Sequence, residues 1–539
     1  MRDYATAYRG FSVAELERSV LGQPLDEGLN VAVACCDRWA DEDRVALEFV
    51  ARDFTRERVT FRRLQSASAR FANLLAARGI FRGDVVAGLL PRIPDLLTTM
   101  LGVWRAGAIY QPLFTAFGPA PIESRVTGRG GSQAKLIVTD AANSSKLDEV
   151  ANAPPVLLID HGQPGATAFA DELAAQSEDF APVALGPDDI FVTLFTSGTT
   201  GSPKGVRIPL RLLLAAAVYA LDGLDLRSED RYWTVADPGW AYGLYYAVVA
   251  PLLLGHATTF FEGGFTAEAA VRVIKTLGID NLAAAPTAYR AMMAAGEAAM
   301  APIAGQLRVT SSAGEPLNPE VVRWASRVLG CPLSDHYGQT EIGMAINNHH
   351  GLKHEAKPGS AGLAMPGFDL AVLDDALRPV APGTSGVLAV HRATSPMFTF
   401  TGYWRADTPQ LTDEWYVTGD TMSQDADGHF FFAGRNDDII TSSGYRIGPF
   451  DVESVMIEHP AIAEVAVVGK PDPERTEIVK AFVVLRKGAA PSAALAAELQ
   501  QHVRKRLSLH AYPREVEFID ELPKTPSGKV QRFVLRKRG

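Results

Sequence analysis

A segment rich in glycine and hydroxyl side chains, TSGTTGSPKG at 196–205, has the composition of a loop that binds phosphate. Backbone N–H groups and hydroxyls can surround phosphate oxygens, and Lys204 adds a positive charge. The Walker A pattern does not fit, because Pro203 stands where a glycine is needed and Gly205 where Ser or Thr is needed. The segment therefore predicts a phosphate site outside the ordinary P-loop class, with an exposed turn of small residues as the alternative.

The segment SSAGEPLNPE, at 311–320, could contact a nucleotide base. Part of it has the pattern of a helix start, with Asn318 as the N-cap and Pro319 at the first helical position. Capping does not account for the Gly-Glu-Pro that precedes it, so a binding role remains open beside the capping role.

The segment DHYGQTEIG, at 335–343, places the carboxylate of Glu341 beside the hydroxyl of Thr340 at the expected end of a strand. A nucleotide-bound Mg²⁺ is commonly held by one or two carboxylates together with phosphate oxygens. Glu341 is therefore a candidate magnesium ligand, and a solvated glutamate on a loop is the alternative.

Three segments near the C-terminal end carry further candidates. In YVTGD, Asp420 could accept hydrogen bonds from two ribose hydroxyls, and Arg435 in GRNDDIITSSGYRIG could donate to the same sugar or to a phosphate. The alternative is a hairpin whose aspartates form turns. In LPKTPSGKVQR, Lys529 stands in an irregular loop, for which a flexible basic tail is the alternative.

The elements that must position these residues alternate between strand and helix from about residue 190 onward. Strands are expected at 189–197, 257–263, 281–286 and 307–314, and helices at 210–221, 266–278 and 318–330. This order predicts βαβ units and a mostly parallel sheet, in which ligands bind beyond the carboxyl ends of the strands. The phosphate segment follows a strand, which agrees with that placement.

The last hundred residues predict a separate, small α+β domain. We expect a hairpin over 429–448, helices at 449–460 and 492–507, strands at 462–472 and 478–488, and a loop ending at Lys529. The boundary is expected between Gly434 and Asp438. The predicted division is an N-terminal domain of residues 1–433, a hinge of 434–438 and a C-terminal domain of 439–539.

Composition narrows the function classes. A chain of 539 residues is expected to form several domains, and 47% hydrophobic with 21% charged residues is typical of a soluble enzyme. The formal charge of −10 argues against bulk binding to nucleic acid or anionic lipid. The apolar runs are too short to cross a bilayer, and the start of the chain has no signal-peptide pattern. Cys35, Cys36 and Cys331 form no metal or disulfide pattern, which favours a cytoplasmic setting.

Six of these motifs, in this order, resemble those of the adenylate-forming (AMP-forming) acyl-CoA synthetases. Relatives of that family include peptide-synthetase adenylation domains and firefly-type luciferases. The segments ADPGWAYG, at 236–243, and LNVAVACCDRW, at 29–39, are most similar to the acetyl-, propionyl- and medium-chain branch. The resemblance covers nearly the whole chain. It implies an α/β fold with a large N-terminal domain of parallel-type sheets and a small, mobile C-terminal α+β domain.

The resemblance implies a two-step reaction. A carboxylate attacks the α-phosphate of MgATP and forms an acyl-adenylate, and the thiol of coenzyme A then attacks the acyl carbon and releases AMP. Mg²⁺ is the implied cofactor, ATP and CoA are co-substrates, and the oligomeric state stays open. The attacking carboxylate is already ionised at pH 7, so the first step needs positioning and charge stabilisation rather than a general base.

The resemblance also implies a role for each matching residue. Phosphate contacts are implied for Thr196, Ser197, Thr199, Thr200 and Lys204, and contacts with adenine for Gly314, Glu315, Pro316 and Asp335. Thr340 would contact the α-phosphate, Glu341 the Mg²⁺, and Asp420 with Arg435 the ribose. Lys529 would bridge the attacking carboxylate and the α-phosphate. Asp437 would be the hinge residue, and Gly444 and Arg446 would contact CoA after the domain rotates.

The acyl group is expected near Trp240, Ala241, Tyr242, Ala313 and Gly338. In the strict acetyl-CoA synthetases a tryptophan stands at the position of Gly338, so the space past this glycine predicts a short-to-medium-chain acid rather than acetate alone.

Other functions remain open at this point. One alternative is an amino-acid- or aryl-acid-adenylating enzyme, for which Asp237 is the nearby carboxylate that could pair with a substrate ammonium. Another is a luciferase-type oxygenase. A third is a non-catalytic nucleotide-binding homologue, against which the presence of Lys529, Glu341 and Asp420 counts.

Overall fold

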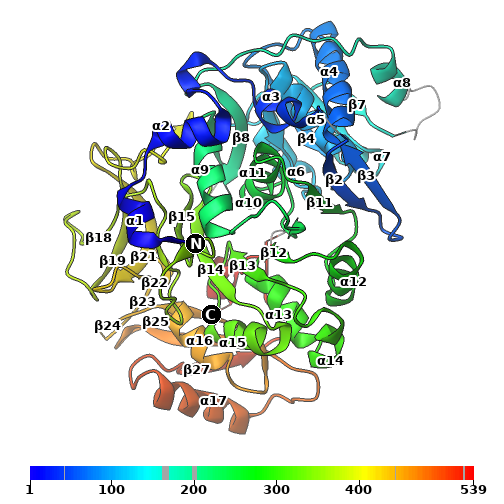
Figure 1. Ribbon diagram of the computed structural model, residues 1–539. Coiled ribbons are helices and arrows are strands. Elements are labelled where there is room, and N and C mark those ends of the chain that lie inside the picture. The colour runs from blue at the N-terminus through cyan, green and yellow to red at the C-terminus, as the bar shows by residue number, and fades with distance from the viewer. Residues whose placement is uncertain (42, 161–168, 197–202, 444, 526–527, 539) are drawn as a thin grey trace.

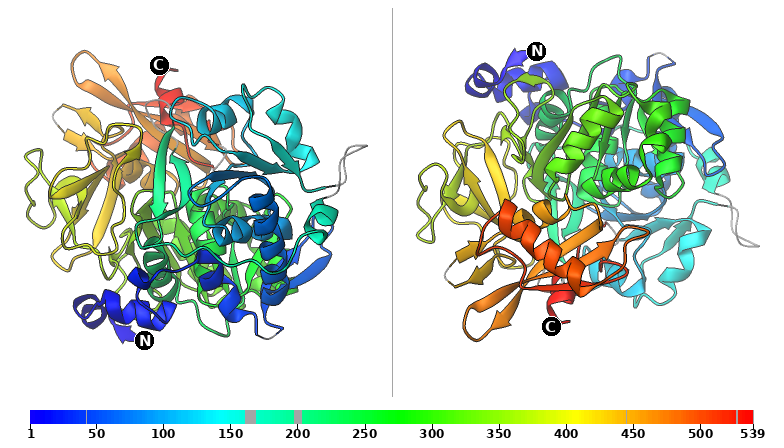
Figure 2. Two further views of the ribbon diagram at one scale, coloured as in Figure 1. Left: turned by 90° about the horizontal axis from the view of Figure 1, so that it is seen from above. Right: turned by 90° about the horizontal axis from the view of Figure 1, so that it is seen from below.

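The computed structural model describes residues 1–41, 43–160, 169–196, 203–443, 445–525 and 528–538 (Figure 1). Figures 1 and 2 show the orange-to-red C-terminal residues gathered on one side of the larger blue-to-yellow part of the chain. Two large sheets form the centre of that larger part. Within the described ranges, no helix is both long and apolar enough to span a membrane.

One of these sheets has seven strands and is parallel over most of its width. Its order is β20 (Tyr403–Trp404), β9 (Lys204–Pro209), β8 (Ile190–Thr196), β5 (Ile109–Pro112), β4 (Val85–Leu89), β6 (Leu136–Thr139) and β7 (Val156–Leu158). Neighbours from β8 to β7 run parallel, whereas β9 and β20 are antiparallel. Strands β4, β5 and β6 are almost wholly buried, as short apolar runs are in parallel sheets covered on both faces.

The other central sheet has six strands and carries the candidate nucleotide segments. Its order is β10 (Tyr232–Thr234), β12 (Asn281–Ala284), β13 (Val309–Ala313), β14 (Leu333–Gln339), β15 (Gly343–Asn347) and β17 (Leu363–Ala364). The first four strands are parallel, and the last two are antiparallel to their neighbours. The carboxyl ends of β12, β13 and β14 therefore meet at one edge of this sheet.

Helices cover these sheets with apolar faces. They include α4 (Phe61–Ala77), α5 (Pro94–Arg105), α9 (Leu212–Val218), α12 (Ala267–Leu277), α13 (Pro286–Ala294) and α15 (Pro319–Trp324). In α12 the buried residues are Ala270, Val273, Ile274 and Leu277, which is the spacing of one helix face. Thr266 caps its first turn by accepting from the Ala269 N–H, and Gly278 ends it at φ +68°.

A four-stranded antiparallel sheet follows, with the order β18 (Leu370–Leu373), β19 (Ser385–His391), β21 (Trp415–Gln424) and β22 (Phe430–Arg435). The register of β21 and β22 places Asp420 opposite Arg435. Two residues that are 15 positions apart in sequence thus become neighbours across one strand pair.

The C-terminal part is a compact α+β unit with its own apolar core. It comprises β23 (Ile440–Ser442), β24 (Tyr445–Ile447), α16 (Pro449–Met456), β25 (Ile462–Asp472), β26 (Thr476–Leu485), α17 (Ala493–Arg506), β27 (Glu515–Phe518) and α18 (Arg532–Arg536). Its core contains Val452, Val467, Val483 and Leu499. The predicted helices and strands of this region are confirmed.

Two sequence predictions about local structure are wrong. The chain does not pass from the strand at 189–197 through a loop alone to the helix at 210–221, because β9 begins at Lys204, within the segment 196–205, and pairs with β8. The alternation of buried Val206 and Ile208 around the half-buried Arg207 is a strand pattern that the glycine-rich sequence before it obscured. Residues 429–448 are not one hairpin either, since β22 pairs with β21 and β23 pairs with β24.

Candidate active site

A cavity of about 830 Å³ opens where the carboxyl ends of β8, β13 and β14 face the antiparallel sheet and the C-terminal unit. Most of the candidates that the sequence predicted lie in its wall: Thr196, Lys204, Trp240, Ala241, Gly314, Glu315, Pro316, Asp335, Gly338, Thr340, Glu341, Asp420, Arg435, Asp437 and Lys529. Ligands are expected at this edge of parallel sheets. The fold thus brings together residues that are up to 333 positions apart in sequence.

The remaining candidates fall into two groups. Ser197, Thr199, Thr200 and Gly444, as well as the side chain of Arg446, lie outside the described residues. Tyr242 and Ala313 lie behind the cavity wall instead of in it. The Tyr242 side chain is buried in the core with its hydroxyl 2.9 Å from that of Tyr219, and Ala313 is 1% exposed.

Lys204 and Glu341 both contact the side chain of Tyr403. The pairing of β20 with β9 brings Tyr403 beside Lys204, whose Nζ lies 4.7 Å from the centre of the tyrosine ring. The Tyr403 hydroxyl donates a hydrogen bond of 2.7 Å to Glu341 Oε1. Burial raises the pKa of Glu341, while this hydrogen bond acts in the opposite direction. One aromatic residue thereby contacts a cation with its ring and a carboxylate with its hydroxyl.

One carboxylate oxygen of Asp420 accepts hydrogen bonds from described residues, and the other accepts none from them. The Tyr337 hydroxyl and the Gln339 amide each donate to Oδ2 at 2.6 Å. No described residue hydrogen-bonds to the buried Oδ1, although Arg435 Nε lies 3.5 Å from it. Burial raises the pKa of Asp420, and Arg435 opposes that shift. A buried acceptor without a partner is costly, so this oxygen is suited to accept hydrogen bonds from a ligand.

The Gly-Glu-Pro segment is fixed by contacts on both sides. Gly314 has φ +94°, and a Cβ at this position would lie 3.4 Å from the Trp240 ring. Glu315 forms an ion pair of 2.6 Å with Arg290 and accepts hydrogen bonds of 2.9 Å from Thr287. Glycine allows the positive φ at this position, and the ion pair fixes the turn that follows.

Asp335 is a buried carboxyl at the start of the nucleotide segment. Burial raises its pKa to about 8, against donation from the backbone N–H groups of Leu317 and His336. Its Oδ1 is buried and lacks a hydrogen-bond partner among the residues described. Like Asp420, it presents an unsatisfied polar atom at the cavity.

Lys529 reaches the cavity from the C-terminal unit. Its Nζ lies 6.0 Å from the centre of the Trp240 ring, which belongs to the large N-terminal part. The residue keeps exposed surface, yet desolvation of its ammonium group lowers the pKa, against the attraction of Glu315, Asp420 and Glu341. The negative charges of these three carboxylates attract the Lys529 ammonium toward the cavity.

Contacts between α15 and α16 hold the C-terminal unit in this position. Asn318 occupies the N-cap position of α15, as predicted, but its side chain does not cap the helix. Instead its Nδ2 donates to Ser454 Oγ at 3.2 Å, and Arg323 forms an ion pair of 3.1 Å with Glu458. A residue that the sequence assigned to local capping therefore joins the two parts of the chain.

The segment that connects the two parts is held by the last helix. The Asp437 carbonyl accepts a hydrogen bond of 3.0 Å from Arg536, and the Asp438 carboxylate pairs with Arg536 and, at 4.0 Å, with Arg532. Both arginines belong to α18, which begins three residues after Lys529. The connection and the loop that carries the lysine are thus joined through α18.

The acyl end of the cavity differs from the expectation. Trp240, Ala241 and Gly338 line it, but a Cβ at Gly338 would lie 2.2 Å from the Gly343 carbonyl oxygen and 2.7 Å from Met344 Sδ. The space that was expected past Gly338 is therefore filled by β15. On the Cβ side of Gly338 there is therefore no room for a longer acyl chain, and the expectation of an acid longer than acetate stays a prediction without support from that side.

Several contacting residues were not predicted from the sequence. Tyr337 and Gln339 lie inside the DHYGQTEIG segment, where their spacing of two places both side chains on one face of β14. That period could have marked them as partners of one group. Tyr403 and Arg290 lie outside every motif, and no local pattern identifies them.

Comparisons with known proteins agree with this geometry. A family model described as "AMP-binding enzyme" matches residues 36–404, and one described as "AMP-binding enzyme C-terminal domain" matches residues 451–529. An acetyl-coenzyme A synthetase of Bacillus subtilis (strain 168) is 37% identical, with 99% of this chain and 95% of the relative covered. The crystal structure of an acyl-CoA synthetase of Brucella canis is 54% identical with a TM-score of 0.81, and covers 100% of this chain and 99% of its own.

Two crystal structures of MatB from Rhodopseudomonas palustris, each 26% identical and covering 95% of this chain and 99% of MatB, differ in their similarity to it. The ATP-bound structure has a TM-score of 0.83 and the apo structure 0.74. The arrangement of the present chain is thus more similar to the ATP-bound form of that protein. Fold, motifs and whole-length relatives together lead to one conclusion: the chain belongs to the AMP-binding enzyme family, as an AMP-forming acid–thiol ligase of the acyl-CoA synthetase type.

Proposed function

We propose that the protein converts a short-to-medium-chain carboxylic acid, ATP and CoA into acyl-CoA, AMP and pyrophosphate through an acyl-adenylate. The observation that carries this proposal is the position of Lys529, which the C-terminal unit places in the same cavity as Glu341 and Asp420. A cation is needed there in the first step, when an anionic carboxylate approaches an anionic phosphate.

In the first step, the acid carboxylate attacks the α-phosphorus and pyrophosphate leaves. The Lys529 ammonium would lie between the two anions and stabilise the charge that develops on the α-phosphate oxygens. Lys204 and the hydroxyl of Thr196 would hold the departing phosphates, and Thr340 the α-phosphate. Thr196 and Lys204 are positioned by paired strands, and we expect catalysis to come from positioning rather than from proton transfer.

The residues around Glu341 fit a magnesium ion. Its carboxylate faces the cavity, is desolvated, and offers the hard oxygen ligands that Mg²⁺ prefers together with phosphate oxygens. When bound, the ion would neutralise charge on the phosphates. Glu341 would hold it, with its orientation set by the Tyr403 hydroxyl.

The nucleoside would lie between the six-stranded sheet and the four-stranded antiparallel sheet. Asp420 Oδ1 and Arg435 would contact the ribose, since Oδ1 is the carboxylate oxygen left without a hydrogen bond among described residues. Gly314, Glu315 and Pro316 would pack against adenine, and Asp335 would lie near its amino group. The two unsatisfied carboxyl oxygens support this placement.

For the second step, we propose that the C-terminal domain of residues 439–539 rotates about a hinge at 434–438, with Asp437 as the residue that turns. Gly444 and Arg446 would then line the path of CoA. Support comes from the few polar contacts that hold this segment beside α18, a hydrogen bond from Arg536 to the Asp437 carbonyl and an ion pair of Arg536 with Asp438, because such contacts can be exchanged when the domain turns. We keep the expectation of a cytoplasmic enzyme with these small-molecule partners and no nucleic acid.

The identity of the acid rests on the wall formed by Trp240 and Ala241, which is apolar. An amino acid fits less well, because Asp237 is engaged: its Oδ1 accepts from the Gly239 N–H at 2.7 Å and Oδ2 lies 3.9 Å from Arg92 Nε. Each methylene that is buried contributes about 0.8 kcal/mol, so neighbouring chain lengths should differ modestly.

The test is a panel of carboxylic acids assayed for CoA-dependent AMP release. The panel should contain straight-chain acids from acetate to octanoate, benzoate, and two amino acids. We expect the highest kcat/KM with an acid longer than acetate. Release of AMP with amino acids alone, or no turnover of any acid, would reject the proposal.

A further inference from the structure

Tyr403 contacts both of the charged side chains that face the phosphate end of the cavity. Its hydroxyl donates to Glu341 Oε1 at 2.7 Å, and its ring lies 4.7 Å from Lys204 Nζ. These partners are 62 and 199 positions away in sequence. No motif of the chain includes this tyrosine, and the reaction scheme above gives it no contact with substrate.

The position of Tyr403 is set by the backbone. Strand β20 pairs antiparallel with β9, in a register that places Tyr403 opposite Val206 and Trp404 opposite Gly205. The Tyr403 N–H donates to Thr408 Oγ1 at 2.8 Å, and Phe400 packs edge-to-face on its ring at 5.1 Å. The strand pair therefore fixes the backbone at Tyr403, and the contacts with Phe400 and Glu341 restrain the ring and its hydroxyl.

The two contacts of Tyr403 are chemically different. The hydroxyl donates a hydrogen bond that fixes one oxygen of a desolvated carboxylate and so orients the other. The ring face attracts the ammonium of Lys204 through its quadrupole and needs no hydroxyl to do so. One side chain can thus set the direction of a metal-binding carboxylate and the position of a phosphate-binding cation.

We propose that Tyr403 is a positioning residue that couples the metal contact of Glu341 to the phosphate contact of Lys204. Its hydroxyl orients Glu341 for Mg²⁺, and its ring positions the Lys204 ammonium to contact the departing phosphates. This inference rests on the proposed function, because both roles refer to bound MgATP. It adds a residue that the motifs do not contain, and it assigns different tasks to the hydroxyl and to the ring.

The two tasks can be separated by substitution. Tyr403→Phe keeps the ring beside Lys204 and removes the hydroxyl, whereas Tyr403→Leu removes both. Tyr8→Phe is the matched control, since the Tyr8 hydroxyl donates to the Phe368 carbonyl at 2.7 Å, away from the cavity. Binding of ATP is measured by calorimetry without any acid substrate, over a series of Mg²⁺ concentrations. Binding of pyrophosphate is measured in the same way without added metal.

For Tyr403→Phe, we expect the Mg²⁺ concentration for half-maximal ATP binding to rise about 10-fold, the scale of lost contacts to metal ligands. Its affinity for pyrophosphate should stay within about 2-fold, because the ring remains. Tyr403→Leu should show the same metal shift and an additional loss of about 3-fold or more in pyrophosphate affinity. Tyr8→Phe should match the wild type in both measurements.

A double-mutant cycle with Glu341→Gln tests whether the hydroxyl acts through the carboxylate. In the Glu341→Gln background, Tyr403→Phe should cause no further change in the Mg²⁺ midpoint. An equal shift in both backgrounds, or a Tyr403→Phe midpoint equal to that of Tyr8→Phe, would reject the inference while leaving the proposed ligase activity intact. If the wild type shows no Mg²⁺-dependent binding of ATP, both the inference and the proposed function fail.

Discussion

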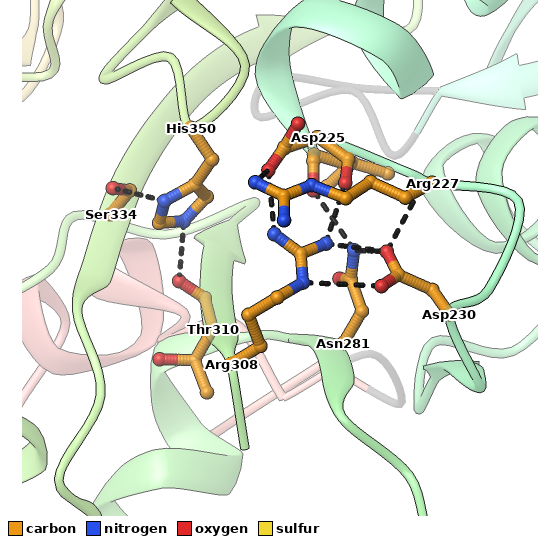
Figure 3. A network of polar contacts seen from close by, with 9 residues as sticks. Asp225, Arg227, Asp230, Asn281, Arg308, Thr310, Ser334 and His350 are labelled. Atoms are coloured by element: carbon orange, nitrogen blue, oxygen red, sulfur yellow. Dashed lines mark hydrogen bonds and ion pairs between the residues drawn. The ribbon is translucent and has the colours of Figure 1, made fainter. Parts of the chain in front are cut away.

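The polar groups at the two ends of strands β12, β13 and β14 differ in their partners: one end has a network of ion pairs, and the other faces the cavity. At the amino ends, Asn281, Arg308, Thr310 and Ser334 join a network with Asp225, Arg227, Asp230 and His350 (Figure 3). At the carboxyl ends lie the cavity and the candidate catalytic residues. These strands therefore have a network of paired charges at one edge and, at the other, a cavity whose wall also includes residues of β21 and of the C-terminal unit.

In the network at the amino ends, the arginine side chains form ion pairs with the aspartate side chains. Arg308 lies between Asp225 and Asp230: its Nε lies 3.1 Å from Asp230 Oδ1, and its Nη2 donates to the Asp225 carbonyl at 2.7 Å. Asn281 donates to Asp230 at 3.0 Å. His350 reaches the Thr310 carbonyl at 2.9 Å, and burial lowers its pKa to about 4, so it stays neutral. The loop before β10 is thus joined to Asn281 of β12 and to Arg308 just before β13, and His350 joins β13 to β14.

At the carboxyl ends the unsatisfied acceptors are carboxylate oxygens in the cavity wall, whereas at the amino ends the Asn281 amide oxygen lacks a hydrogen bond among the described residues. Asp420 and Asp335 each bury an oxygen for which the described part of the chain supplies no hydrogen bond, and burial raises both pKa values. Such groups cost stability in the free protein. The difference indicates that the amino ends serve stability and the carboxyl ends serve binding, which predicts that substitutions at the two ends affect different measurements.

The largest expected effect is at the carboxyl end. Lys529→Ala should reduce the rate of adenylate formation by about 10²–10³-fold, because it removes a cation from the developing charge. Thermal stability should not fall, since desolvation disfavours this ammonium in the folded protein. Thioester formation from a supplied acyl-adenylate should remain largely intact. An equal loss in both half-reactions, measured by pyrophosphate exchange and by thioester release, would contradict the role of Lys529.

The opposite result is expected at the amino end. Arg308→Met should lower the free energy of unfolding by about 2–3 kcal/mol, because it leaves Asp225 and Asp230 without their shared cation. This is below the value for a fully buried pair, since 25% of the Arg308 side chain is exposed. The kcat/KM of the folded enzyme should be unchanged. Chemical denaturation and kinetics at 25 °C separate the two effects.

A matched arginine provides the control for that experiment. Arg327 pairs with Glu297 on the surface, and the two side chains are 61% and 63% exposed. Arg327→Met should change stability by less than about 0.5 kcal/mol. If both arginine variants lose the same stability, the network at the amino ends has no special role.

A smaller effect on binding is expected for Asp420→Asn. The amide keeps the volume and the contacts with Tyr337 and Gln339 but loses the charge that strengthens hydrogen bonds from ribose hydroxyls. ATP affinity should fall about 10-fold, while stability stays equal or rises because a buried carboxylate is removed. Calorimetry and thermal melting of the same preparation test this pair of expectations. A less stable variant with unchanged ATP affinity would place Asp420 with the stabilising groups.

A further expected effect is a change in pH dependence, which grows with the pH interval that is compared. Asp335 has a pKa of about 8 in the folded protein, against an ordinary value of 3.8, so the folded state keeps a proton that the unfolded chain releases. Stability from this group therefore falls as the pH rises from about 4 to 8, by at most about 1.4 kcal/mol per pH unit. Asp335→Asn should remove that slope, and its advantage in melting temperature over the wild type should grow between pH 5 and 8. Parallel pH profiles would show that Asp335 ionises normally.

The sequence predicted the residues at the cavity better than their partners. Lys204, Glu341, Asp420 and Lys529 stand in motifs whose spacing marks the ends of strands or loops, and the fold brings them to one cavity. Tyr403 was missed because its contacts depend on a two-residue strand that pairs across 199 positions. Pairing at such a distance leaves no local pattern.

The expectation of open space beside Gly338 was not met, for a related reason. The space beside a glycine depends on what packs against it, and here a register shift in β14 between Tyr337 and Gly338 places the Gly343 carbonyl there. A bulge of this kind changes the direction of a side chain without any change in hydrophobic pattern. The sequence of the segment alone therefore could not show that the pocket ends at this glycine.

The salt bridges of α18 have a consequence for building hybrid enzymes from this chain and a relative. Arg532 and Arg536 contact the carboxylate of Asp438, and Arg536 also donates to the carbonyl of Asp437, so the last helix (the tail) and residues 437–438 (the connector) are joined by complementary charges. A crossover placed after Asp438 would combine connector and tail from different parents and leave these charges mismatched. A crossover before Asp437 keeps both from one parent, and it is the junction at which exchanged C-terminal domains should retain their native docking.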